Sequence, residues 1–203
     1  MNRANYHRGM RTLPRLAIAC TALPLLVAMS ACSSGDTATV DEGSASTVAV
    51  VTSDCAIGAP GTAQTTAPAG SAVSSGLWVD WAGDAAPIVT VSDDAPPVTE
   101  LVIADLAEGS GPAVAPGGTL TVNYCGVGLS SGEIFDSSWT RGEPITFPLD
   151  GLIQGWIDGL PGMKVGGKRM LVIPGALAYG NSPPPGIEPD ETLAFAIELT
   201  AAA

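Results

Sequence analysis

The carboxyl-terminal half of this chain of 203 residues predicts an α+β domain in which about five strands pack against one short helix. Apolar and polar residues alternate in Thr119–Cys125, and apolar residues take every second position of Thr192–Thr200, as in strands with one buried face. The segment Gly151–Leu160 instead spaces its apolar residues as a short amphipathic helix does. Residues 96–203 thus form one predicted domain of about 105 residues, which is long enough to bury a core of its own.

Three further strands and their boundaries follow from the same patterns. The strands are predicted at Val98–Leu106, at Ile134 with Phe135, and at Lys168–Ile173. After the first of them, residues 109–118 hold four glycines and two prolines, which predict turns. Residues 161–162, Pro-Gly, end the predicted helix because neither residue continues helical backbone readily.

Residues 47–95 are predicted to be an extension that packs against this domain and is partly disordered. Short additional strands are predicted at Thr47–Thr52, Leu77–Trp81 and Pro87–Val91. The intervening Ala56–Gly76 is rich in Gly, Ala, Thr, Pro and Ser, which favours a loop or disorder. These patterns do not decide whether the extension folds by itself.

The first 31 residues have the composition of a secretory signal. Four arginines come first, and Leu16–Ala31 is an apolar stretch of about 16 residues, shorter than the roughly 20 that span a bilayer. Small residues before Cys32 resemble the bacterial lipobox, although Met29 replaces the more usual leucine. The resemblance implies that residues 1–31 are removed and that lipidated Cys32 anchors the exported protein to the outer face of the bacterial cell membrane, through a flexible tether over residues 32–46. The alternative is an ordinary secretory signal with an incidental cysteine.

The charge distribution excludes nucleic acid as a partner of the exported part. The chain has eight basic and twenty acidic residues, a formal net charge of −12. Four of the basic residues lie in the predicted signal and all the acidic ones follow Cys32, so the part beyond Cys32 carries a formal −16. Such a surface repels phosphate backbones. Its simplest role is to keep the protein soluble.

The cysteines and the single histidine restrict the chemistry further. His7 lies in the predicted signal, which excludes a histidine-based zinc site, a Ser-His triad and a Cys-His pair from the mature chain. No metal and no cofactor are expected. With Cys20 removed and Cys32 lipidated, Cys55 and Cys125 remain, and a bridge between them is predicted for an oxidising compartment. The alternative is two unpaired thiols, with Cys125 packed in the core.

Five motifs follow one another in the carboxyl-terminal half. They are VNYCG (122–126), IFDSS (134–138), GLIQGWIDGLPGMKVGGKRMLVIP (151–174), AYG (178–180) and TLAFAIELT (192–200). In this order and spacing they resemble the FKBP-type peptidyl-prolyl cis-trans isomerase family, and with the signal they resemble a bacterial lipoprotein form of it. The resemblance implies a twisted antiparallel sheet of about five strands wrapped on one short helix. It also implies an enzyme that accelerates X-Pro rotation in exported proteins. The implied partners are proline-containing polypeptides, macrolide inhibitors and, through the lipid, the membrane.

The same resemblance assigns the site residue by residue. The implied catalytic residues are Tyr124, Asp136, Tyr179 and Phe195, and the implied substrate contacts are Phe135, Arg141, Ile145, Leu152, Ile153, Trp156 and Ile187. The Tyr179 hydroxyl and the Ile153 N–H are the implied donors to substrate carbonyls. Asp136 is implied to orient Tyr124 and Arg141.

These residue types suit isomerisation without covalent chemistry. The uncatalysed X-Pro barrier is about 20 kcal/mol, most of it amide resonance that is lost when the bond twists. A dry aromatic pocket favours the twisted state, whose carbonyl is less polar, over the planar hydrated one. The alternative for Phe135, Trp156 and Phe195 is plain core packing, but both tyrosines beyond the signal fall on implied pocket positions. The alternative function is a catalytically weak module that binds proline-containing segments or a membrane partner through the same pocket.

Three positions depart from the family's pattern. Ile145 stands where the family has a pocket phenylalanine, Pro184 replaces a loop histidine, and Glu188 replaces an isoleucine beside Ile187. We expect the first change to keep apolar surface but to lose a ring. The departures leave substrate preference and macrolide affinity open, and they bear less on activity.

Overall fold

The computed structural model describes residues 49–58, 61–64 and 70–203, which belong to one compact unit spanning residues 43–203. Its strands are β1 (Val50–Asp54), β2 (Thr62–Gln64), β3 (Ser71–Ser74), β4 (Leu77–Asp80), β5 (Ile88–Ser92), β6 (Val102–Ala107), β7 (Thr119–Gly128), β8 (Ile134–Ser137), β9 (Ile145–Pro148), β10 (Lys168–Ile173) and β11 (Leu193–Ala202). Its helices are α1 (Gln154–Gly159) and three short 3₁₀ turns, η1 (Trp139–Arg141), η2 (Leu149–Gly151) and η3 (Gly175–Leu177). The predicted signal, Cys32 and the tether lie outside the described residues. None of the helices in the described ranges is long and apolar enough to cross a membrane.

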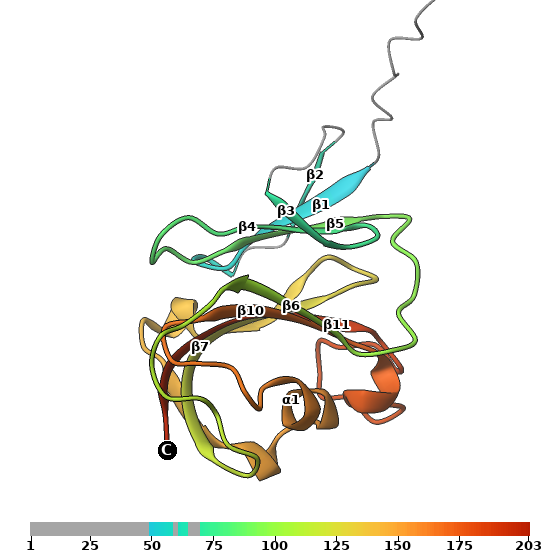
Figure 1. The fold of residues 1–203 in the computed structure, drawn as a ribbon. Coiled ribbons are helices and arrows are strands. Elements are labelled where there is room, and N and C mark those ends of the chain that lie inside the picture. The colour runs from blue at the N-terminus through green and yellow to red at the C-terminus, as the bar shows by residue number, and fades with distance from the viewer. Residues whose placement is uncertain (1–48, 59–60, 65–69) are drawn as a thin grey trace, which may run out of the picture. The chain divides into compact units, whose positions relative to one another are not determined.

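The strands form two antiparallel sheets, which Figure 1 shows stacked on each other. The N-terminal sheet has the order β2-β1-β5-β4-β3, and the C-terminal sheet has the order β6-β10-β11-β7-β8, with β9 also paired to β7. The strands predicted near Leu77–Trp81, Pro87–Val91 and Lys168–Ile173 are confirmed. The loop predicted over Ala56–Gly76 is wrong in part, because β2 and β3 lie within it. Their residues are mostly small and polar, so their pairing with β1 and β4 rather than apolar alternation makes them strands.

The C-terminal sheet has six strands, one more than the predicted five. The additional strand is β9, which follows Arg141 and ends in a proline. β7 is ten residues long and pairs with β11 along one side. Its other side pairs with two strands, because Thr119–Val122 lies opposite β9 and Cys125–Val127 lies opposite β8. The sheet therefore bends around the helix with β8 and β9 along one edge.

The helix lies close against the concave face of this sheet (Figure 1). It is shorter than predicted, because η2 and an extended Ile153 (φ −63°, ψ 151°) precede it. Gly155 and Gly159 face β10, and a Cβ on either glycine would collide with a β10 side chain. The absence of these Cβ atoms permits the close approach, which determines how near the sheet the intervening Trp156 lies.

Each face of the C-terminal sheet covers a separate hydrophobic core. Alternate residues of β7, β10 and β11 point toward α1, among them Leu120, Val122, Tyr124, Leu171, Ile173, Phe195 and Ile197. The residues between them point toward the N-terminal sheet, where Cys125, Val127, Met170, Val172 and Ala196 pack with Cys55, Leu77, Val79, Val89 and Val91. The sheet is thus covered on both sides, and the space for a ligand lies on the α1 side.

Candidate active site

The pocket lies between the concave face of the C-terminal sheet and the start of α1. It has a volume of about 290 Å³ and is lined by Tyr124, Phe135, Asp136, Phe147, Gly151, Leu152, Ile153, Trp156, Tyr179 and Phe195. Eight of these ten residues were implied by the family resemblance, and Phe147 and Gly151 were missed. Residues from β7, β8, β9, β11, the segment from η2 into α1 and the turn after η3 thus meet at one site.

Aromatic rings form the floor of the pocket. Trp156 is only 4% exposed and meets Phe195 edge-on at 5.3 Å and Tyr124 at 5.7 Å between ring centroids. Phe135 meets Phe195 in the same way at 5.5 Å. Each such pair contributes about 0.5–1.5 kcal/mol beyond the burial of its area. The edge-on contacts hold the rings in one arrangement, so the floor is apolar and rigid.

A polar group of three side chains closes one side of the floor. The Tyr124 hydroxyl donates to Oδ2 of Asp136, and Arg141 donates from Nη1 to Oδ1 of Asp136 at 2.5 Å. Arg141 also donates from Nη2 to the Tyr124 hydroxyl oxygen at 3.0 Å, and its guanidinium lies 5.6 Å from the centroid of the same ring. Both carboxylate oxygens of Asp136 are therefore held in place, and charge-assisted bonds of this kind are among the stronger ones.

The local backbone brings these three residues together. β7 and β8 pair with Gly126 opposite Asp136, so Asp136 lies near the β7 tyrosine. The Tyr124 N–H donates to the Ser138 hydroxyl at 2.8 Å, and the Ser138 N–H donates back to the Tyr124 carbonyl at 2.9 Å. The chain then turns through η1, which ends at Arg141 and returns the guanidinium to the carboxylate. The serines after Asp136 thus do more than form a turn.

Burial and charge keep the phenols protonated. Burial, together with the hydrogen bond to Asp136, raises the pKa of Tyr124 to about 12. Burial and the nearby Asp136 charge also raise the pKa of Tyr179. The hydrogen bond to Asp136 raises the pKa of Arg141 further above its already high value. At neutral pH the site therefore presents two phenolic O–H groups and one guanidinium.

Two hydrogen-bond donors at the pocket have no partner among the described residues. One is the hydroxyl of Tyr179, a side chain that is 39% exposed, and the other is the Ile153 N–H just before α1. The buried indole N–H of Trp156 likewise has no partner in the described part of the chain. The first two donors are available to a ligand at the pocket.

Three implied substrate contacts do not line the pocket. Arg141 instead hydrogen-bonds to Asp136 and Tyr124. Ile187 is buried in the core beneath, and Ile145 is partly buried against the same core. The ring expected to be lost at Ile145 is supplied by Phe147, which lies two residues further along the same face of β9. The two-residue period of a strand, applied from Ile145, could have found it.

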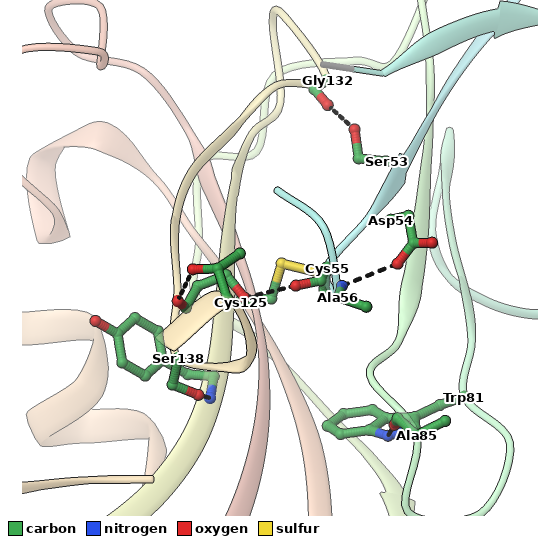
Figure 2. The surroundings of a disulfide bond; sticks show 12 residues. Ser53, Asp54, Cys55, Ala56, Trp81, Ala85, Cys125, Gly132 and Ser138 are labelled. Carbon is green, nitrogen blue, oxygen red and sulfur yellow. Dashed lines mark hydrogen bonds between the residues drawn. A yellow bond between two sulfur atoms is a disulfide. The ribbon is translucent and has the colours of Figure 1, made fainter. Parts of the chain in front are cut away.

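Cys55 and Cys125 are joined by a disulfide that links the two sheets (Figure 2). Both residues are fully buried, and their Cα atoms are 5.9 Å apart. Cys125 directly follows Tyr124, so the bridge attaches the N-terminal sheet beside a pocket residue. In the described residues no group of three or more His, Cys, Asp or Glu side chains is arranged to hold a metal ion.

Known proteins resemble the C-terminal part of this chain. The family model for FKBP-type peptidyl-prolyl cis-trans isomerases matches residues 111–200. A probable FK506-binding protein of Corynebacterium glutamicum is 49% identical over 107 residues, which are 53% of this chain and 91% of the relative. An FK506-binding protein of Streptomyces anulatus is 49% identical over 109 residues, 52% of this chain and 88% of the relative. The crystal structure of FkpA from Escherichia coli aligns with a TM-score of 0.48 at 46% identity, over 53% of this chain and 50% of that one.

The chain therefore belongs to the FKBP-type peptidyl-prolyl cis-trans isomerase family, as its motifs predicted. Its enzyme class is that of a peptidyl-prolyl cis-trans isomerase, and the family as a whole binds proline-containing substrates and macrolides. The family match begins after the last strand of the N-terminal sheet, β5.

Proposed function

We propose that this enzyme accelerates rotation about X-Pro bonds in exported proteins, by desolvation and hydrogen bonding in the aromatic pocket. The observation that carries the proposal is the geometry of the pocket. A rigid apolar floor lies beside two donors that have no partner within the described ranges and a carboxylate held by Tyr124 and Arg141. No side chain there is paired as a nucleophile with a base, and rotation about a bond needs none.

The floor acts on the amide that twists. A planar X-Pro amide is stabilised by resonance and by water on its polarised carbonyl, and the barrier of about 20 kcal/mol reflects the loss of both. Between Trp156, Phe195 and Phe147, the proline ring and the amide lose that water before they rotate. Lowering the barrier by roughly 5 kcal/mol gives nearly four decades of rate.

The polar groups position the substrate around the twisting bond. The Tyr179 hydroxyl and the Ile153 N–H donate to carbonyls on either side of the bond, which holds the peptide while the amide rotates. Asp136, itself held by Tyr124 and Arg141, presents its carboxylate to the carbonyl carbon of the twisting amide. Hydrogen bonds that strengthen as the bond twists lower the barrier, whereas equally strong ones in both states do not.

Residues 1–46 place this activity outside the membrane in our proposal. Cys32 carries the lipid, and more than one acyl chain gives stable anchoring, since each buried methylene contributes about 0.8 kcal/mol. The Cys55–Cys125 disulfide supports export, because such bonds persist in oxidising compartments. Mass spectrometry of the intact cell-derived protein tests the anchor. An unacylated Cys32, or a first residue other than Cys32, would contradict it.

A protease-coupled assay with a short Xaa-Pro peptide tests the activity. We expect a rate well above background for the chain from residue 33 onward, and lower rates for Asp136→Ala and Tyr179→Phe. The alternative of a catalytically weak module that binds proline-containing segments predicts peptide binding with no rate above background. That outcome, with both variants indistinguishable from the parent chain, would sink the enzymatic proposal and leave the binding one.

A further inference from the structure

A second hollow adjoins the isomerase pocket on the side of the N-terminal sheet. It has a volume of about 230 Å³. The turn residues Ile57 and Gly58 line one side, and β8 with Thr140 lines the other. Phe135 and Asp136 line both hollows, so the second begins at the rim of the first.

One side of this hollow, at Ile57 and Gly58, is formed by residues that the family match does not cover. Ile57 is 68% exposed, more than any other exposed large hydrophobic residue in the described ranges. A single exposed isoleucine on a mobile loop would need no explanation. Ile57 differs because it stands at the edge of a substrate pocket on a turn that is attached to that pocket.

Two hydrogen bonds hold the turn together internally, and two further interactions attach it to β7 and β8. Asp54 begins it, with its carboxylate accepting the Ala56 N–H at 2.9 Å and its carbonyl accepting the Gly58 N–H at 3.1 Å. The Cys55 carbonyl accepts the Ser137 hydroxyl at 2.8 Å, and the disulfide ties Cys55 to β7. Figure 2 shows the disulfide with the Asp54 to Ala56 bond beside it. Ser137 directly follows Asp136, so its hydrogen bond to Cys55 attaches the turn to the rim of the pocket.

Close packing at Gly58 and between two tryptophans adds to this attachment. Gly58 has a positive φ of 58°, and a Cβ there would lie 2.9 Å from Thr140 Cγ2. Nearby, Trp81 of the segment after β4 meets Trp139 of η1 edge-on at 5.6 Å. The N-terminal sheet therefore contacts the segment between Asp136 and Arg141 at several points, and a preformed wall binds a ligand with little ordering cost.

We propose that the Ile57 turn and β8 form a second substrate subsite, which holds an apolar side chain of the client polypeptide outside the X-Pro pair. The inference rests on the proposed isomerase function. The occupant of this subsite follows from the position of the hollow, which shares Phe135 and Asp136 with the isomerase pocket. An extended chain advances about 3.3–3.6 Å per residue, so the residues flanking a bound proline must cross the rim. The exposed lining of the hollow is mostly polar, and Ile57 is its exposed apolar side chain. An apolar side chain that crosses past Asp136 and packs on Ile57 removes the contacting surface of both from water.

The test compares two peptide lengths on the full chain in detergent micelles. One substrate is a proline tetrapeptide, and the other extends it by several residues on both sides, with leucines as the flanking residues. The variant is Ile57→Ala, and Ile103→Ala on β6 is the matched control, because Ile103 is also exposed and lines neither hollow. For Ile57→Ala we expect the ratio of kcat/KM between the long and the short peptide to fall about fivefold, mainly through KM, as when part of one isoleucine is no longer buried.

A second measurement does not depend on turnover. Long peptides carrying a photoreactive leucine at successive distances from the proline are cross-linked to the protein, and the adducts are mapped by mass spectrometry. Adducts on residues 55–58 at one or two of these distances support the subsite. Adducts confined to the rim near Tyr179, or an unchanged ratio in Ile57→Ala, overturn it. Equal losses on both peptides also overturn it, because Ile57 would then act only by supporting the pocket. An inactive parent chain that still gives adducts on residues 55–58 sinks the isomerase proposal and leaves the subsite.

Discussion

The two sheets are built from similar short antiparallel strands, yet they differ in what their buried side chains do. In the C-terminal sheet the concave face carries aromatic rings and a carboxylate that meet at a pocket. Between the two sheets the core is aliphatic, with one disulfide. The comparison indicates that chemistry and stability are divided between the two faces of one sheet. Changes on the concave face should reduce the rate of isomerisation, and changes between the sheets should reduce the stability.

The sharpest test of this division is removal of the disulfide. In the double variant Cys55→Ala with Cys125→Ala, we expect a loss of about 4 kcal/mol in unfolding free energy, because the bridge closes a loop with a sequence separation of 70. Urea unfolding measures it, and reduction of the parent chain should give a similar loss while leaving the variant unaffected. Below the unfolding transition the rate on a tetrapeptide should persist. A strong loss of that rate would show that the two faces are not separate.

The aliphatic core between the sheets should respond almost as strongly. Leu77 is fully buried there, so Leu77→Ala should cost about 3 kcal/mol through lost burial and the cavity that remains. Ile88→Ala on the neighbouring β5 is the control, because Ile88 is exposed. Equal thermal unfolding midpoints for the two variants would mean that the N-terminal sheet contributes little to the fold.

On the concave face, Asp136→Ala should slow isomerisation by about 10- to 100-fold. The change removes charge-assisted hydrogen bonds to Tyr124 and Arg141, each worth about 1.5–3 kcal/mol. The protease-coupled assay measures the rate, and Asp80→Ala on β4, an exposed carboxylate in the N-terminal sheet, is the control. If both variants kept the parent rate, the carboxylate would have no part in the reaction.

A smaller loss, about three- to tenfold, is expected for Tyr179→Phe. The variant removes one hydroxyl that has no partner among the described residues, so the substrate loses about 1 kcal/mol of hydrogen bonding and the fold loses almost none. The rate and the thermal midpoint should be measured together. A lower thermal unfolding midpoint with an unchanged isomerisation rate would show that the Tyr179 hydroxyl supports the fold and not the substrate.

The last expected effect is the alkaline loss of stability that comes from Tyr124. Its pKa is raised to about 12 in the folded protein from an ordinary value near 10, so folding favours the neutral phenol. This contribution to stability is complete below pH 10 and is lost as the pH rises from 10 toward 12. The unfolding free energy of the parent chain, measured with urea, should therefore fall more steeply between pH 10 and pH 12 than that of Tyr124→Phe. Parallel pH profiles would show that the phenol is not held neutral by the fold.

The family and most of the site could be predicted because they depend on the order of short sequence motifs and on residue types that are rare in this chain. Four of the pocket residues stand in short sequence motifs, whose order and spacing can be recognised without the structure. They are Tyr124, Asp136, Trp156 and Tyr179, and all four line the pocket. Phe147 was missed because the expectation followed single motif positions rather than the period of the strand. Ile145 and Ile187 do not line the pocket but pack against the core beside or beneath it, so their role as substrate contacts stays a prediction.

The N-terminal sheet was harder to predict. β2 and β3 consist mostly of small and polar residues, which carry no periodic signal, and their partners lie elsewhere in the chain. One available signal was not used. The nearly unbroken apolar run in β10 is typical of a strand buried on both faces, and it indicates a second layer over the sheet.

The sequence by itself determined the family, the residue types of the pocket and the positions of the longer strands, because these follow from short-range spacing and from side-chain chemistry. Only the tertiary structure decided between the predicted Cys55–Cys125 bridge and two unpaired thiols, and only it placed the turn that carries Ile57 beside Asp136. Those relations join segments up to 82 residues apart, as in the bond from Ser137 to Cys55. Such contacts depend on how two sheets pack against each other, which no local pattern encodes.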